Sequence, residues 1–286
     1  MSHESRRISP LKEFLALMRR SFLVLVYDRR GFVLSILFPI SASVVTVFIA
    51  GEDMFVNYEG TKSACFVFCC AAIWGGLFNS IQIVAKERDG IRRDYAAGLR
   101  LGCYTLSKVS VQAALCVLQA AFLTGGLYGV RLIYGNELPV SGLVFPAALV
   151  EYGISLYLLM FAADGMGLFI SCLVRKAETA SIIAPYILIL QLIFSGILFA
   201  MDGVSNILSY SMLSRWGMEA LGSISDLNSI PLRINEQFPM IPHEAEEMFT
   251  YSGQHLIVSW LVLAAFAAGF ILMGDLALHR ISKDSR

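Results

Sequence analysis

Charged residues are scarce in this chain of 286 residues: only 15% of it is charged, whereas 57% is hydrophobic. Soluble domains carry about 25% charged and about 45–50% apolar residues, so this composition excludes an ordinary soluble fold. The 22 basic and 22 acidic residues balance. Net charge therefore gives no indication of a nucleic-acid partner, and none is predicted.

Several motifs of catalytic and metal sites are missing. The sequence has no G-x-x-x-x-G-K-[ST] loop to cradle phosphates, no G-x-S-x-G, and no H-E-x-x-H or H-x-x-x-H. The first absence excludes ATP hydrolysis through a P-loop on this chain. The others remove the usual patterns of a serine hydrolase and of a zinc enzyme. We therefore predict no catalytic residue, no metal site and no cofactor on the chain.

Cysteines are few, and their positions argue against a disulfide scaffold. No C-x-x-C occurs, and no cysteine follows Asp202, where the longest polar segment begins. Disulfide scaffolds place cysteines in extracellular segments. The six cysteines are therefore interpreted as small apolar residues.

Long apolar runs dominate the sequence instead. A helix needs about 20 mostly apolar residues to cross a hydrocarbon core about 30 Å thick. Six runs are long enough, so we predict an all-α membrane protein whose residues 31–286 form one domain of six transmembrane helices. The predicted spans are Gly31–Ala50, Ala64–Val84, Val109–Leu132, Phe145–Leu173, Ser181–Met201 and Leu256–Leu276.

Residues 1–30 are predicted to form a cytoplasmic tail and an amphipathic helix. Ser9 and Pro10 suit the N-cap and the first position of a helix. Apolar residues then recur every three or four positions as far as Leu25, with basic residues on the other faces. This pattern is typical of a helix in the membrane interface. Packing against a soluble domain is the alternative.

The distribution of Lys and Arg predicts the orientation, because cytoplasmic loops carry the excess of these residues. With both termini cytoplasmic, 18 of the 22 basic residues lie inside. We therefore expect a plasma-membrane protein, in bacteria an inner-membrane one, with residues 202–251 outside. Within that external loop, residues 204–221 are predicted to dip into the membrane as a re-entrant segment.

The internal loop 85–108 concentrates charge of both signs between two apolar runs. It could anchor the topology, bind anionic lipid headgroups, or dock a cytosolic protein. Basic residues suit all three roles, but the carboxylates of Glu87, Asp89 and Asp94 would be repelled by anionic lipid. Mixed charge favours a protein partner, where complementary charges fix the register.

The same loop resembles a segment of the G subfamily of ABC transporters. That family has the pattern E-R-x-x-x-x-R-E-x-x-x-G-x-Y before its third span, followed by a tyrosine and a lysine. Asp94 replaces the family's glutamate, and Arg100 replaces its first tyrosine. The matching residues are Glu87, Arg88, Arg93, Gly98, Tyr104 and Lys108.

Two later segments resemble the same family. "SCLVRKAETASIIAPYILILQLIFSGILF", residues 171–199, is similar to its passage from fourth to fifth span, and "LSRWGMEAL", residues 213–221, to the segment after the fifth. The three matches occur in the family's order. They imply a type-2 ABC exporter fold, with the wider group of bacterial stand-alone permeases as the expected variant.

The resemblance implies a coupling helix in loop 85–108, with Glu87, Arg88, Arg93 and Asp94 contacting an ATP-binding subunit. ATP and Mg would bind to that partner. A second copy or a similar permease would complete the transporter, with lipid around it. Its substrate would be hydrophobic or amphipathic and leave from the cytosol or the inner leaflet.

The family also implies a gate near the two-fold axis at Phe194, Ser195, Gly196, Ile197 and Leu198; ordinary apolar span residues are the alternative. The family's substrate-clamping phenylalanine has no clear match. Gly75 stands near that position, between Trp74 and Phe78.

Polar residues inside spans are costly and are candidates for function. Asn79 and Gln82 are three residues apart and suit either helix-to-helix hydrogen bonds or a cavity. Asp164 suits either a structural hydrogen bond or a gating or substrate role. The rival hypothesis is a membrane enzyme or an ATP-independent channel that uses Asp164 or Glu151. Neither needs a docking loop of mixed charge.

Overall fold

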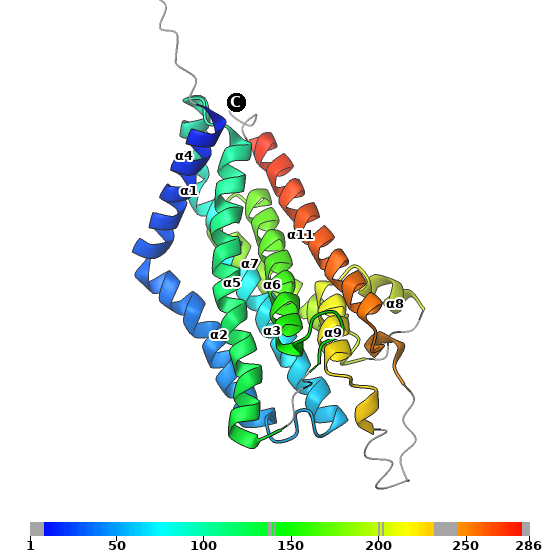
Figure 1. The fold of residues 1–286 in the computed structure, drawn as a ribbon. Coiled ribbons are helices and arrows are strands. Elements are labelled where there is room, and N and C mark those ends of the chain that lie inside the picture. The colour runs from blue at the N-terminus through cyan, green and yellow to red at the C-terminus, as the bar shows by residue number, and fades with distance from the viewer. Residues whose placement is uncertain are drawn as a thin grey trace, which may run out of the picture.

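The structure, a computed structural model, describes residues 9–136, 139, 141–199, 201, 203–231 and 245–281. All regular structure in these residues is helical (Figure 1). The predicted tail before residue 9 lies outside the described residues, as do residues 232–244 of the predicted external loop. The helices are α1 (Pro10–Tyr27), α2 (Arg29–Ala50), α3 (Tyr58–Ser80), α4 (Ile83–Ala96), α5 (Leu101–Tyr134), α6 (Ala148–Leu173), α7 (Ala177–Ile193), α8 (Val204–Ser209), α9 (Leu213–Ile224), the 3-10 turn η1 (Glu247–Phe249) and α11 (Gly253–Ile281).

Within the described residues, five helices are long and apolar enough to cross a membrane: α2, α3, α5, α6 and α11. They correspond to five of the six predicted spans, and α2 and α6 end at the predicted residues, Ala50 and Leu173. The chain is therefore a multi-pass helical membrane protein.

The remaining predicted span, Ser181–Met201, differs from the structure. Its helix α7 has 17 residues and ends at Ile193, because the chain then turns. Gly196 has a φ of +80°, a left-handed conformation that is incompatible with a continuing helix and that glycine adopts readily. At about 1.5 Å per residue, α7 is about 25 Å long, below the thickness of the hydrocarbon core.

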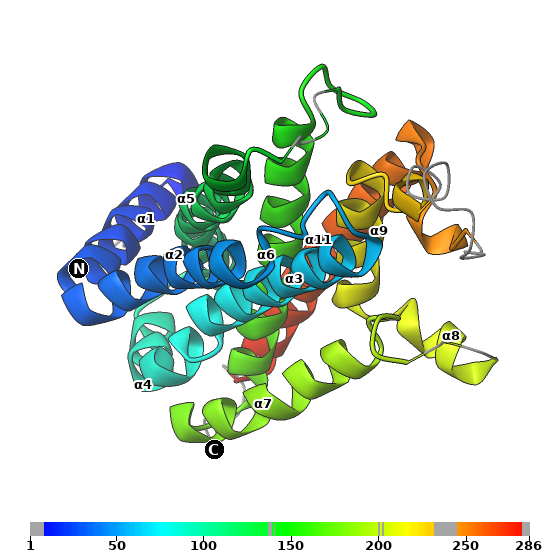
Figure 2. The same ribbon diagram turned by 90° about the horizontal axis from the view of Figure 1, so that it is seen from below.

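Helix α6 lies at the centre of the bundle and packs against α3, α5 and α11 (Figures 1 and 2). Its contact with α3 is a close approach of backbones. A Cβ atom added at Gly76 would lie 2.0 Å from the carbonyl oxygen of Met160, and one added at Gly167 would lie 2.7 Å from that of Leu77. Small residues allow such contacts between membrane helices.

Helix α1 begins at Pro10, as predicted, and packs along α5. Asp28 separates it from α2 and accepts a hydrogen bond of 3.1 Å from the backbone N–H of Gly31. The two helices meet there at an angle (Figure 1). The apolar side chains of Leu11, Leu15 and Phe22 are exposed on α1, a surface suited to the membrane interface.

The predicted re-entrant segment forms two short helices, α8 and α9. Helix α9 is packed between α3, α6 and α11, and most of its residues are buried. Its first turn is fixed by Gln191 at the end of α7, whose side-chain oxygen accepts a 3.0 Å hydrogen bond from the N–H of Ser214.

Candidate coupling helix and membrane cavities

The predicted coupling segment forms helix α4, which follows α3 after a turn at Ile81 and Gln82. Glu87 fastens α4 to the adjacent end of α5. Its carboxylate accepts a 2.8 Å hydrogen bond from the Tyr104 hydroxyl and pairs with the Lys108 ammonium at 2.7 Å. The side chain of Lys108 is only 8% exposed, so this ion pair is largely shielded from water.

Arg88 fastens a neighbouring face of α4 to the end of α6. Its side chain is buried, and its guanidinium donates a 2.5 Å hydrogen bond to the carbonyl of Val174. That carbonyl directly follows the last turn of α6, where helix carbonyls need external donors. Glu87 and Arg88 therefore attach α4 to two transmembrane helices.

Asp94 lies near the end of α4 and faces α1. It pairs with Arg20 at 3.0 Å, and both side chains are about half exposed. Glu13 makes a second link, because its carboxylate accepts a 2.8 Å hydrogen bond from the backbone N–H of Arg100. Helix α1 is thus tied to the charged block at two points.

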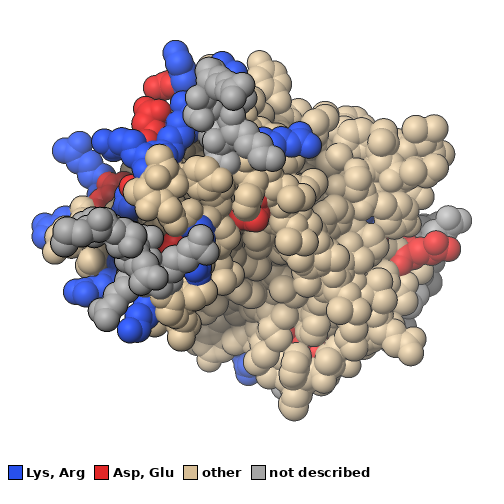
Figure 3. Space-filling model, turned by 90° about the horizontal axis from the view of Figure 1, so that it is seen from above, with Lys and Arg blue, Asp and Glu red and all other residues tan. Residues whose placement is uncertain are grey.

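Of the four predicted coupling residues, Arg93 is exposed, Glu87 and Asp94 are intermediate, and Arg88 is buried. Three charged residues that the prediction did not select share this exposure: Lys86, Asp89 and Arg92. Lys86 and Asp89 are three residues apart, and Arg92 and Arg93 follow Asp89 by three and four residues. Residues at these spacings share one face of a helix, and this pattern could have identified them. Figure 3 shows charged side chains of both signs gathered at this end of the molecule.

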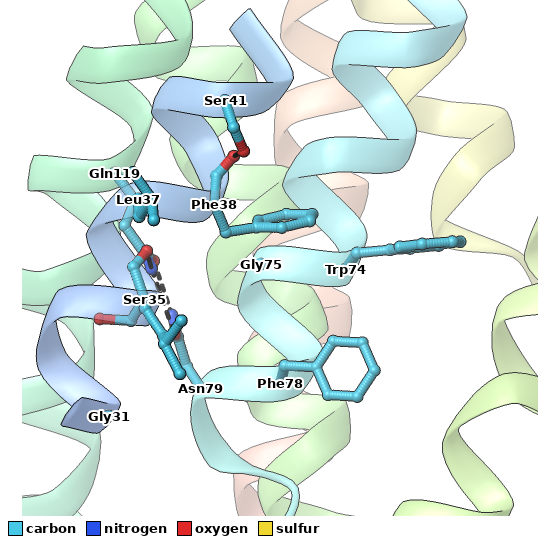
Figure 4. Close-up of a pocket in the computed structure, with 11 residues that line it drawn as sticks. Gly31, Ser35, Leu37, Phe38, Ser41, Trp74, Gly75, Phe78, Asn79 and Gln119 are labelled. Carbon is cyan, nitrogen blue, oxygen red and sulfur yellow. Dashed lines mark hydrogen bonds between the residues drawn. The ribbon is translucent and has the colours of Figure 1, made fainter. Parts of the chain in front are cut away.

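A cavity of about 450 Å³ lies between α2 and α3 at the depth of the membrane helices. Its walls are mostly apolar, and the ring of Phe38 reaches across to the backbone at Gly75 (Figure 4). Trp74 and Phe78 also line it. Gly75, which stands near the position of the family's clamping phenylalanine, is therefore part of a cavity wall.

Asn79 contributes polar atoms to the same cavity. Its amide exchanges two hydrogen bonds, of 2.6 and 3.1 Å, with the amide of Gln119 on α5, and Gln119 also donates a 2.7 Å bond to the carbonyl of Ser35 (Figure 4). Gln82 bonds elsewhere, to the hydroxyl of Ser181 on α7. The two residues therefore connect different helices, because α3 ends between them.

The two intramembrane carboxylates have different surroundings. Glu151 is fully buried and accepts hydrogen bonds from the backbone N–H groups of residues 143, 144 and 145, so it holds the turn before α6. Asp164 is 1% exposed, and its Oδ1 has no hydrogen-bond partner among the described residues. It lies where α6 crosses α3, and its backbone carbonyl accepts a bond from the Ser80 hydroxyl.

The predicted gate, Phe194 to Leu198, forms the turn after α7 rather than a continuation of its helix. Ser195 is buried and donates a 2.8 Å hydrogen bond to the carbonyl of Leu192, whereas Leu198 is 52% exposed. Gly196 faces Arg215 of α9, since a Cβ atom there would lie 3.2 Å from the guanidinium.

Sequence reasoning missed a buried charged cluster beneath this turn. Arg215 pairs with Glu219 at 2.8 Å, one helical turn apart on α9, and His255 of α11 lies 3.9 Å from the same carboxylate. Burial raises the pKa of Glu219, and the guanidinium of Arg215 opposes that shift. Arg215 and Glu219 are four residues apart in an otherwise apolar stretch, and this spacing could have indicated an ion pair on one helix face.

Together, the helices and the charged end define a multi-pass membrane protein. Comparison with known sequences identifies the family: the "ABC-2 type transporter" profile matches residues 12–224, so the chain belongs to that family. It constitutes a permease domain, which itself lacks ATPase activity.

A curated relative is the "ABC transporter ATP-binding/permease protein Rv1747" of Mycobacterium tuberculosis (strain ATCC 25618 / H37Rv). The two are 24% identical over 274 residues, which are 92% of this chain and 30% of the relative. The chain therefore spans about a third of the relative's length.

Proposed function

We propose that this chain is the permease of an ATP-driven exporter that removes a hydrophobic or amphipathic substrate from the cytosol or the inner leaflet. The observation that carries the proposal is α4. It is fastened to α5 and α6 by Glu87 and Arg88, yet presents Asp89, Arg92 and Arg93 outward. A helix that transmits force needs both a rigid attachment and a free docking face.

The proposed energy source is an ATP-binding cassette that contacts this face and binds ATP and Mg. The relative's name combines ATP-binding and permease functions, which supports a cassette either on a partner chain or fused to the permease. In this arrangement Arg93 contacts the cassette. Glu87, Arg88 and Asp94 position the helix.

The proposed topology has six spans, with α7 and the turn after it as the fifth and both termini in the cytoplasm of a plasma membrane. A second copy would pack against α7, whose exposed apolar face includes Ile182, Tyr186 and Ile189. Phe194 to Leu198 would lie at the outer end of this contact as a gate.

The proposed substrate path uses the cavity at Asn79, which offers polar and apolar walls together. In this proposal Gln82 positions the start of α4 against α7. Asp164 has a positioning role where α3 crosses α6. The rival enzyme or channel hypothesis is less well supported, because Glu151 already accepts three backbone hydrogen bonds.

The test is ATPase activity in the reconstituted permease–cassette complex. Arg92→Glu with Arg93→Glu should abolish transport-stimulated ATP hydrolysis and weaken cassette binding at least tenfold, because it reverses two exposed charges. Arg131→Glu is the matched control, since Arg131 is also exposed but lies at the other end of α5. Unchanged cassette binding in the double variant would refute the docking role of α4.

A further inference from the structure

Two adjoining cavities form a continuous groove beside α2 and α3. The cavity of about 450 Å³ described above shares Gly31, Ser35, Phe78 and Asn79 with a second cavity of about 260 Å³. The second one extends toward α1, α4 and α5 and reaches the charged end of the molecule. We call the two together the α2–α3 groove.

The larger half of the groove is suited to a hydrocarbon chain. Leu34, Leu37 and Phe38 line it from α2, and Trp74 and Phe78 line it from α3. Gly75 contributes no side chain, and the Phe38 ring lies against its backbone (Figure 4). Its volume is within the range of sites for small molecules, about 300–1,000 Å³.

The smaller half contains a buried acceptor that lacks a donor. Gln112 is 6% exposed and lines the cavity, and its Nε2 donates a 3.3 Å hydrogen bond to the carbonyl of Asn79. Its Oε1 is buried and has no hydrogen-bond partner among the described residues. A buried acceptor without a donor is costly, so this oxygen indicates a missing N–H or O–H group.

The charges at the mouth define that group further. Glu87 and Lys108 line the smaller half but satisfy one another as an ion pair. Asp28 supplies an exposed carboxylate, and Lys86 supplies an exposed ammonium. The mouth therefore complements a headgroup that carries both a cation with N–H donors and an anion.

We propose that the α2–α3 groove binds one phospholipid with a primary-ammonium headgroup, of the phosphatidylethanolamine type, from the leaflet on the side of α4. The ammonium donates hydrogen bonds to Gln112 and Asp28, and the phosphate lies against Lys86. One acyl chain occupies the apolar half. A choline headgroup has no N–H donor for Gln112, and a glycerol headgroup leaves a net negative charge beside Asp28. Its larger half is the cavity at Asn79 that the proposed substrate path uses, so this inference names a ligand class for that cavity and rests on the proposed function in that respect.

Native mass spectrometry of the chain released from nanodiscs tests this proposal. The nanodiscs contain equal amounts of phosphatidylethanolamine, phosphatidylcholine and phosphatidylglycerol with the same acyl chains. The wild type should retain one phosphatidylethanolamine per chain, at least about tenfold more often than either competitor. Gln112→Met should remove this preference, and Gln112→Glu, which keeps an acceptor oxygen, should preserve it.

A second pair of variants tests the apolar half without altering Gln112. Ser41 lines the groove and donates a 2.8 Å hydrogen bond to the carbonyl of Phe38, so Ser41→Phe should block the chain and reduce retention about tenfold. Ser110→Phe is the control, because Ser110 bonds within its own helix in the same way and does not line the groove.

Equal retention of the three lipids would overturn the proposal, as would a preference for phosphatidylglycerol or retention unaffected by Ser41→Phe. None of these outcomes bears on the cassette. A permease that fails to bind an ATPase but retains this lipid would contradict only the proposed function.

Discussion

At the scale of single residues, burial separates charged side chains that look equivalent in the sequence. Glu87 and Arg93 lie in one charged block, yet the first is paired with Lys108 and the second is exposed. Removing one member of a shielded ion pair leaves the other uncompensated, which is more costly than losing an exposed charge. Substitutions at Glu87 therefore affect folding as well as any coupling.

Glu219 provides a test of burial at this scale. Because burial raises its pKa, the folded protein disfavours the ionised form relative to the unfolded chain. The wild type therefore loses stability from Glu219 as pH rises from the ordinary glutamate value, about 4.3, through the raised value. Glu219→Gln cannot titrate, so its thermal stability relative to the wild type should increase with pH over that interval. A difference that stays constant or falls with pH would contradict the shift.

At the scale of elements, α4 is defined by its two ends and by its neighbours. It begins after the turn at Ile81 and Gln82, and its last residue precedes Ala97 and Gly98, where φ reaches +104°. This left-handed conformation strongly favours glycine. Gly90, in contrast, lies within α4, and no neighbouring atom comes within 4 Å of the position that a Cβ atom would occupy there.

These two glycines make a matched pair of substitutions. Gly90→Ala should stabilise the protein by about 0.5–1 kcal/mol, because alanine favours a helix and meets no neighbour. Gly98→Ala should destabilise it by about 1–2 kcal/mol, because the left-handed conformation brings Cβ close to the following carbonyl. Thermal unfolding in one detergent measures both. Equal effects of the same sign would contradict the left-handed conformation of Gly98 at the end of α4.

At the scale of the whole molecule, the shorter apolar helix α7 packs less against the rest of the bundle than the long apolar helices do. It lies along one edge of the bundle, with α8 at its far end (Figure 2). Its side chains Ile182, Tyr186 and Ile189 are 64%, 67% and 51% exposed. A face this apolar needs lipid or protein around it, and the proposed transporter places a second copy there.

Cross-linking in membranes tests that arrangement. In a variant whose six cysteines are replaced, Tyr186→Cys should form a disulfide-linked or reagent-linked dimer, because symmetry brings a residue near the axis close to its mate. Leu261→Cys on α11 should not do so, although Leu261 is equally exposed at 64%. Dimers through Leu261 instead would move the contact to α11.

The membrane class, five long helices, the start of α1 and the family could be predicted from the sequence. Those features depend on apolar run length, local caps and short motifs, all of which are contiguous in the chain. The sequence also predicted a helix as far as Met201, whereas α7 ends at Ile193, because the chain turns there with Gly196 in a left-handed conformation.

The packing of the helices set which charges of α4 face inward and which residues line the α2–α3 groove. It also brought His255 of α11 to Arg215 and Glu219 of α9, and gave Glu151 its three backbone donors. These arrangements depend on how separate helices pack. The close approach of α3 and α6 at Gly76 and the break between α1 and α2 at Asp28 set that packing. A local sequence pattern encodes neither the distance nor the angle between two helices.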